Sequence, residues 1–106
     1  MKVKVTRLLA SGQYRIGFEV GSFSAEEADK MNKFGVPNIP MKMVVGGSMT
    51  NRSVGINQIN ANLFASFSSQ KDASDYEESV LAALRNAIDS VRSRNDTFSG
   101  SDEVDI

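Results

Sequence analysis

The chain contains no cysteine, no histidine and no tryptophan among its 106 residues. Without cysteine there is no disulfide framework and no thiolate metal site. Without histidine, the commonest general base and metal ligand is missing as well. Most familiar catalytic constellations therefore cannot be assembled, and we expect a protein that is not an enzyme and that needs no cofactor and no metal.

Long apolar runs are also missing. No uninterrupted stretch approaches the roughly 20 apolar residues that a membrane span requires, and Met1–Val5 lacks the apolar region of a secretory signal. A hydrophobic content of 41% and a charged content of 24% are typical of a soluble globular protein. These features predict a cytoplasmic protein without membrane contact, folded as one domain over residues 1–95.

The net charge of -1 conceals an uneven distribution of charge. Residues 1–71 contain nine Lys or Arg against four acidic residues, a net charge of +5. Residues 72–106 contain three basic residues against nine acidic ones, a net charge of -6. Such asymmetry indicates an anionic partner combined with an acidic tail.

The first third of the chain predicts a β-hairpin and a short helix. Apolar side chains alternate over residues 2–9 and again over 14–20, and Ser11-Gly12 between them supplies a tight turn. Ser24 and Glu27 match a capping box, which predicts a helix that ends near Phe34.

The middle of the chain predicts two further strands. Residues 36–40 contain two prolines, so we expect an extended connector there rather than a strand. A third strand should begin at Met41 and end at Gly46-Gly47, and a weaker fourth strand should run over about residues 50–56.

The strongest signals lie in the segment 59–94. Alternation of apolar and polar side chains at Ala61, Leu63, Ala65 and Phe67 predicts a fifth strand. The asparagine-rich run of Asn57, Asn60 and Asn62 before and within it is equally typical of a bulged strand or a loop. A second capping-box match at Ser74 predicts the start of a long helix, which should end between residues 92 and 95. The buried stripe of that helix should comprise Tyr76, Val80, Leu84, Ile88 and Val91.

The predicted fold class is therefore α+β. We expect an antiparallel sheet of about five strands, a short helix after the second strand and a long C-terminal helix. Residues 96–106 combine Ser, Gly and acidic side chains with few apolar ones. That composition predicts a disordered acidic tail.

Basic residues on the predicted strands form the main candidate site. Lys2, Lys4 and Arg15 fall opposite the apolar faces of their strands and could share one exposed surface that follows a phosphate backbone. The alternative interpretation is that these charges prevent edge-to-edge aggregation. The full candidate set for nucleic-acid binding is Lys2, Lys4, Arg7, Arg15, Lys42, Arg52 and Phe64.

Phe64 is the one large aromatic residue on the polar side of the predicted fifth strand. On a basic sheet, an exposed ring would stack on an unpaired base. Alternatively, the ring belongs to the core or to a contact between subunits. The sequence leaves both interpretations open.

The end of the chain interleaves acidic and apolar residues, and we expect it to bind a protein partner. The residues concerned are Asp102, Glu103, Val104, Asp105 and Ile106. A basic core followed by such a tail resembles bacterial and phage single-stranded DNA-binding proteins, in which the tail recruits partners and competes with DNA. A sheet followed by a long helix is similar to whirly and transcription-cofactor-type single-strand binders, which dimerise.

Two functions follow from these patterns. The first is a dimeric protein that binds single-stranded nucleic acid, with DNA expected, through a basic sheet face, and whose tail is autoinhibitory or recruits a partner. The second is a homo-oligomeric structural or protein-interaction subunit, of phage or plasmid type, without nucleic-acid binding. Clustering of the basic residues on one face would favour the first, and their dispersal would favour the second.

Overall fold

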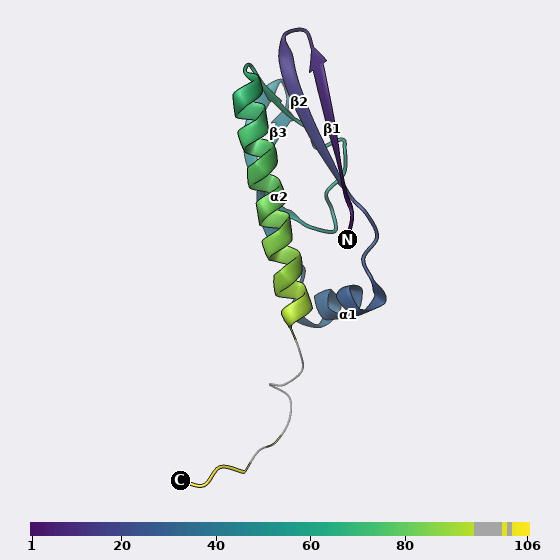
Figure 1. Ribbon diagram of the computed structural model, residues 1–106, viewed down its shortest axis with the longest axis vertical. Coiled ribbons are helices and arrows are strands. Elements are labelled where there is room, and N and C mark those ends of the chain that lie inside the picture. Colours follow the sequence, from purple (N-terminus) through teal and green to yellow (C-terminus); the bar gives the residue numbers. More distant parts are fainter. Residues whose placement is uncertain (95–100, 102) are drawn as a thin grey trace.

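The computed structural model describes residues 1–94, 101 and 103–106 and confirms the α+β class (Figure 1). These residues form five strands and two helices, but the strands make two antiparallel sheets rather than one. One sheet has the order β1-β2-β5 and the other pairs β3 with β4. The elements are β1 (Val3–Ala10), β2 (Gln13–Val20), α1 (Ala25–Phe34), β3 (Asn38–Val45), β4 (Ser48–Gly55), β5 (Ala65–Phe67) and α2 (Gln70–Ser93).

The predicted N-terminal hairpin is confirmed. Strands β1 and β2 pair over their full length, from Val3 opposite Val20 to Ala10 opposite Gln13. The turn residues Ser11 and Gly12 both have positive φ, at 52° and 74°. This two-residue turn matches the right-handed twist of the strands and sets their register.

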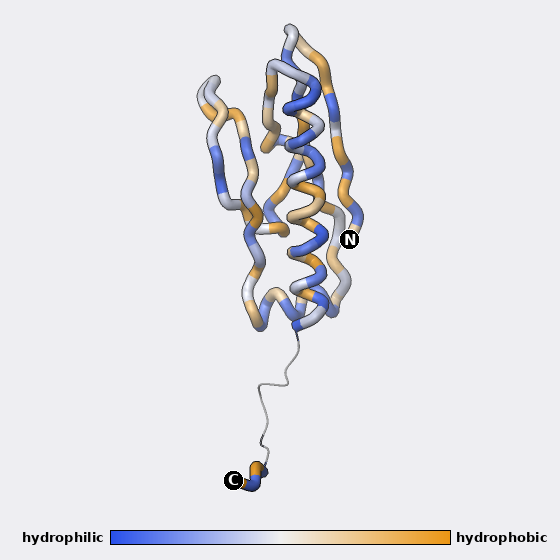
Figure 2. The backbone as a smooth tube through the Cα atoms, turned by 60° about the vertical axis from the view of Figure 1, so that its left-hand side comes forward, coloured by the Kyte–Doolittle hydropathy of each residue, from blue (hydrophilic) through white to orange (hydrophobic). Residues whose placement is uncertain are grey.

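Helix α2 carries the core. Its predicted apolar stripe is buried, and Ala73 and Ala87 join it. In Figure 2, the β3–β4 hairpin lies on one side of α2 and the β1–β2 hairpin on the other. Phe18 of β2 is fully buried and meets Tyr76 of α2 edge-on, with ring centroids 5.9 Å apart. The helix therefore joins the two sheets through a single core.

The prediction of a long strand over residues 61–67 was wrong, because only Ala65–Phe67 is a strand. Asn60 forms a turn: its side-chain Oδ1 accepts from the N–H of Asn62 at 3.0 Å, and its carbonyl accepts from the N–H of Leu63 at 3.1 Å. Such asparagine turns offer the backbone an alternative to a sheet ladder. The apolar alternation across residues 59–65 therefore spans a loop.

Helix α2 begins at Gln70 rather than after Ser74. Ser69 caps it, since its side chain accepts from the N–H of Asp72 at 3.1 Å. The earlier start buries Ala73 and so lengthens the apolar stripe. The predicted capping box at Ser74 therefore lies inside the helix.

Pro40 was wrongly assigned to a connector, because it lies within β3. The backbone N–H groups of Lys42 and Val44 point away from β4, toward the hydroxyl of Tyr76 and the carbonyl of Phe64. Pro40 lies two residues before Lys42 and four before Val44, so its nitrogen points to the same edge, away from β4. The strand therefore loses no hydrogen bond to β4 at the proline.

The capping box of α1 is confirmed. The N–H of Ser24 donates to Glu27 Oε1 at 2.9 Å, and the N–H of Glu27 donates to Ser24 Oγ at 3.1 Å. Arg92 Nε of α2 donates to Glu27 Oε2 at 2.9 Å. The backbone bond from Ser24, and then the bond from Arg92, hold the pKa of the buried Glu27 below its ordinary value. The Glu27 carboxylate therefore links the first turn of α1 to the last turn of α2.

With Gln in place of Glu27, the free energy of unfolding should fall less steeply as the pH is lowered. A carboxyl with a lowered pKa contributes its full stability above its ordinary value of about 4.3, and the contribution disappears as the pH falls through the lower folded pKa. Urea unfolding across the acid range measures the effect. Glu26→Gln is the control, because that side chain is 79% exposed on the same helical turn. If the pH dependence became equally shallow in both variants, the loss of stability at acid pH would not be specific to the Glu27 carboxylate.

Candidate interaction surface

The sheet face that points away from α2 carries part of the predicted basic set. Strand pairing places Lys4 opposite Glu19 and Leu8 opposite Arg15 on this face, which we call the outer face. The ladder continues to Lys2, whose carbonyl accepts from the N–H of Gly21 at 2.7 Å. Lys2, Lys4 and Arg15 therefore share one face, as the alternation predicts.

The loop before β5 covers part of the outer face. A Cβ placed on Gly17 would lie 3.3 Å from the carbonyl oxygen of Ala61, so the glycine allows the loop to pack closely against β2. The guanidinium of Arg15 lies over the half-buried Phe64, 5.1 Å from the ring centroid. Phe64 thus contacts the chain's own arginine, and the structure places it neither in the core nor fully in solvent.

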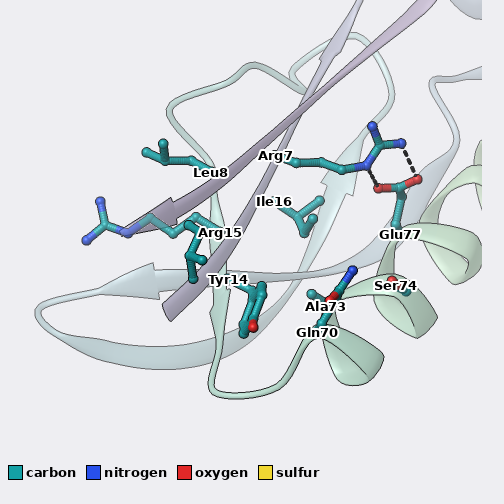
Figure 3. A pocket seen from close by; sticks show the side chains of 10 residues that line it. Arg7, Leu8, Tyr14, Arg15, Ile16, Gln70, Ala73, Ser74 and Glu77 are labelled. Atoms are coloured by element: carbon teal, nitrogen blue, oxygen red, sulfur yellow. Dashed lines mark hydrogen bonds and ion pairs between the residues drawn. The ribbon is translucent and has the colours of Figure 1, made fainter. Parts of the chain in front are cut away.

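Arg7 does not join this set. It points toward α2, where Nε and Nη2 donate to the two carboxylate oxygens of Glu77 at 2.5 and 2.7 Å (Figure 3). In the same view, Leu8 and Arg15 extend from the other side of the hairpin. The Arg7 bond holds the pKa of Glu77 below its ordinary value. The structure therefore gives Arg7 a partner within the fold.

Lys42 and Arg52 lie on the other sheet. Lys42 is exposed opposite Asn51 and lines a hollow with Asp72 and Asp75 of α2. Arg52 is opposite Met41, so it lies on the other face of the β3–β4 hairpin from Lys42. The structure thus divides the predicted basic residues among several surfaces.

The predicted tail site lies partly outside the described residues. Asp102 and residues 96–100 are outside them, so the predicted disorder there is not described. Ser101 and Glu103–Ile106 form neither helix nor strand and are exposed.

No sequence pattern indicated the open edge of β1. The carbonyl of Lys2 accepts a hydrogen bond from the N–H of Gly21, so the peptide groups of Lys2 point toward β2. Ala10 is opposite Gln13 beside the two-residue turn, and such a pair is hydrogen-bonded as well. The peptide groups of the odd-numbered residues must therefore point away from β2. Within the described chain no strand pairs with this edge. The outward peptide groups are those of Val3, Val5, Arg7 and Leu9.

A groove lined by six apolar and three charged side chains runs beside this edge. The helix packs mainly on β2, β3 and β5, so the side chains of β1 that face it are only partly covered. Met1, Val3 and Val5 form one wall of the groove. The other wall belongs to α2 and comprises Leu81, Leu84, Arg85, Ile88, Asp89 and Arg92. The only sequence signal for the groove is that Leu81 lies next to the buried helical stripe.

The chain matches no protein-family model, and comparisons with curated proteins and solved structures find no significant match. Neither described helix combines the length and apolar content needed to cross a membrane. Among residues 1–94, 101 and 103–106, no group of three His, Cys, Asp or Glu side chains could hold a metal ion.

Proposed function

We propose that the chain is a non-enzymatic protein-interaction subunit that binds an extended partner segment along the open edge of β1. The observation that carries this proposal is the row of outward peptide groups at Val3, Val5, Arg7 and Leu9, next to the groove. An added strand would satisfy these groups and place every second side chain in the groove.

The charges beside this edge favour an acidic partner. Lys2 and Lys4 lie on the outer face of β1, and every second side chain of an added strand would stand next to them. A segment that alternates acidic with apolar residues fits both faces. A second copy of β1 fits less well, since it would bring two more lysines to the same side.

A labelled peptide of alternating Glu and Val should bind the full-length chain, whereas alternating Lys and Val should not. Fluorescence anisotropy measures both affinities. Val5→Pro removes one outward N–H and should weaken binding of the Glu/Val peptide at least about tenfold, a loss typical of one essential hydrogen bond. Val5→Ala is the matched control, because it shortens the side chain but keeps that N–H.

The same experiment can contradict the proposal in two ways. Equal affinity for both peptides, or no binding of either, would exclude an acidic strand as the ligand. Sedimentation tests the homodimer predicted from the sequence. A dimer that persists in wild type and dissociates in Val5→Pro would assign the edge to a second copy instead.

A second candidate is single-stranded nucleic-acid binding, which is favoured by Lys2, Lys4 and Arg15 sharing the outer face with Phe64. Three neutralised phosphates would give a slope of log affinity against log salt of about -2. Lys4→Ala/Arg15→Ala should flatten it by about 1.4 units. Lys42→Ala/Arg52→Ala is the control and should not change the slope. No binding to any single strand at low salt would exclude this candidate.

A further inference from the structure

The last residues of the chain have the pattern that the open edge requires. Glu103 and Asp105 alternate with Val104 and Ile106, so an extended conformation puts the acids on one side and the apolar side chains on the other. Val104 and Ile106 are 77% and 120% exposed in the structure. Both are large apolar side chains that gain stability from any site that removes them from water.

The edge of β1 presents the complementary pattern. On the groove side, Val3 and Val5 are half-buried beside Leu81 of α2. On the outer side, Lys2 and Lys4 are exposed. A strand with acids on one side and apolar residues on the other can therefore satisfy both sides in a single register.

The tail is long enough to reach this edge within one chain. Arg92 lines one end of the groove and lies at the last turn of α2. Nine residues, 95–103, separate Arg94 from Val104, and they can span at most about 30 Å. The helical wall from Leu81 to Arg92 is only about 17 Å long.

We propose that Glu103–Ile106 binds along the open edge of β1 of the same chain as an added strand. Val104 and Ile106 then fill the groove, and Glu103 and Asp105 lie beside Lys2 and Lys4. The tail enters at the Arg92 end, so it runs parallel to β1, which is antiparallel to α2 (Figure 1). This inference rests on the proposed function, and it makes the tail an internal competitor of the partner segment.

Amide hydrogen exchange of the full-length chain, followed by NMR, tests the docked state. The outward N–H groups of Val3 and Val5, which would donate to the carbonyls of Glu103 and Asp105, should exchange about tenfold faster in Val104→Ser/Ile106→Ser than in wild type. That factor corresponds to an effective tail concentration of about 1 mM and a Kd of about 0.1 mM. Ser101→Ala is the control in the tail, and the N–H of Thr6, which points toward β2, should be unaffected.

Swapping the charges of the tail and of β1 tests whether Glu103 and Asp105 lie beside Lys2 and Lys4. Glu103→Lys/Asp105→Lys should remove the protection of the edge, and adding Lys2→Glu/Lys4→Glu should restore it. Equal exchange rates in wild type and Val104→Ser/Ile106→Ser would overturn the inference. Protection that grows with protein concentration would also overturn it, because the tail would then bind another chain.

The labelled Glu/Val peptide separates this inference from the proposed function. If the tail competes, the peptide should bind Val104→Ser/Ile106→Ser about tenfold more tightly than wild type. Equal, measurable binding to both proteins would reject the tail as a ligand and leave the edge site intact. Absence of binding to both would reject the edge site itself, and the inference with it.

Discussion

Replacing Leu84 with Ala should lower the free energy of unfolding by about 2 to 5 kcal/mol. The side chain is 1% exposed at the centre of the α2 stripe, in the core that joins both sheets. Truncation removes its buried apolar surface and leaves a cavity that the surrounding strands can only partly fill. Urea unfolding followed by circular dichroism measures the loss, and each kcal/mol should lower Tm by about 4 to 8 °C.

Leu81→Ala is the matched control for this prediction. Leu81 lies one turn earlier on the same helix, but it is half-buried and lines the groove. The same truncation there should cost about 1 to 2 kcal/mol, since less apolar surface returns to water. Equal losses at the two positions would mean that α2 does not bury its Leu84 side in the core.

The local parts of the fold could be predicted because their signals are contained within a few residues. Ser11-Gly12 needs only two positive φ angles to form its turn, and Ser24 and Glu27 bond each other within one helical turn. The stripe of α2 repeats often enough to define its buried face. The pattern that specifies each of these elements is local, so it can be recognised without knowing what packs against the element.

The two errors have different causes, because a distant partner decides the structure at Pro40 and a local turn decides it at Asn60. Pro40 is compatible with β3 because its nitrogen lies on the edge away from β4, and no local pattern specifies that edge. The alternation across residues 59–65 is equally compatible with a strand, until the turn at Asn60 supplies a competing set of hydrogen bonds. A tertiary contact therefore overrides the local signal at Pro40, whereas a local side-chain turn overrides the alternation at Asn60.

The candidate surface shows the same division. Alternation correctly placed Lys4 and Arg15 on one face, because the side-chain period of a strand is local. The position of Arg7 depends on Glu77, which is 70 residues away, and that of Lys42 depends on a second sheet. The open edge of β1 depends on strand order, which the sequence pattern does not contain.

The strand order also explains why the proposed interaction surface lies at β1. Strand β2 has neighbours on both sides, whereas β1 has one, and α2 lies mainly over β2, β3 and β5. The outward peptide groups of β1 therefore have no strand to pair with in the described chain, and its inward side chains are only partly covered by α2. Under the proposed function, a partner strand would pair with this edge.

Replacing Tyr76 with Phe should destabilise the protein by about 1 to 3 kcal/mol. The backbone N–H of Lys42 donates to the Tyr76 hydroxyl at 2.9 Å, and the hydroxyl donates to the carbonyl of Lys42 at 2.9 Å. Burial raises the pKa of the phenol, so the hydroxyl remains a donor at neutral pH. Phenylalanine keeps the ring contacts with Phe18 and Phe67 but leaves both peptide groups of the β3 edge without this partner.

Tyr14→Phe is the control, because the Tyr14 hydroxyl makes no hydrogen bond with the described residues. Urea unfolding should show a loss for Tyr76→Phe and a change within about 0.5 kcal/mol for Tyr14→Phe. Hydrogen exchange adds a local measurement, since the N–H of Lys42 should lose protection while the N–H of Val44, bonded to Phe64, keeps it. If Lys42 remained as protected as in wild type, the Tyr76 hydroxyl would not hold β3 against α2, and side-chain packing together with the Val44–Phe64 hydrogen bond would join the two sheets.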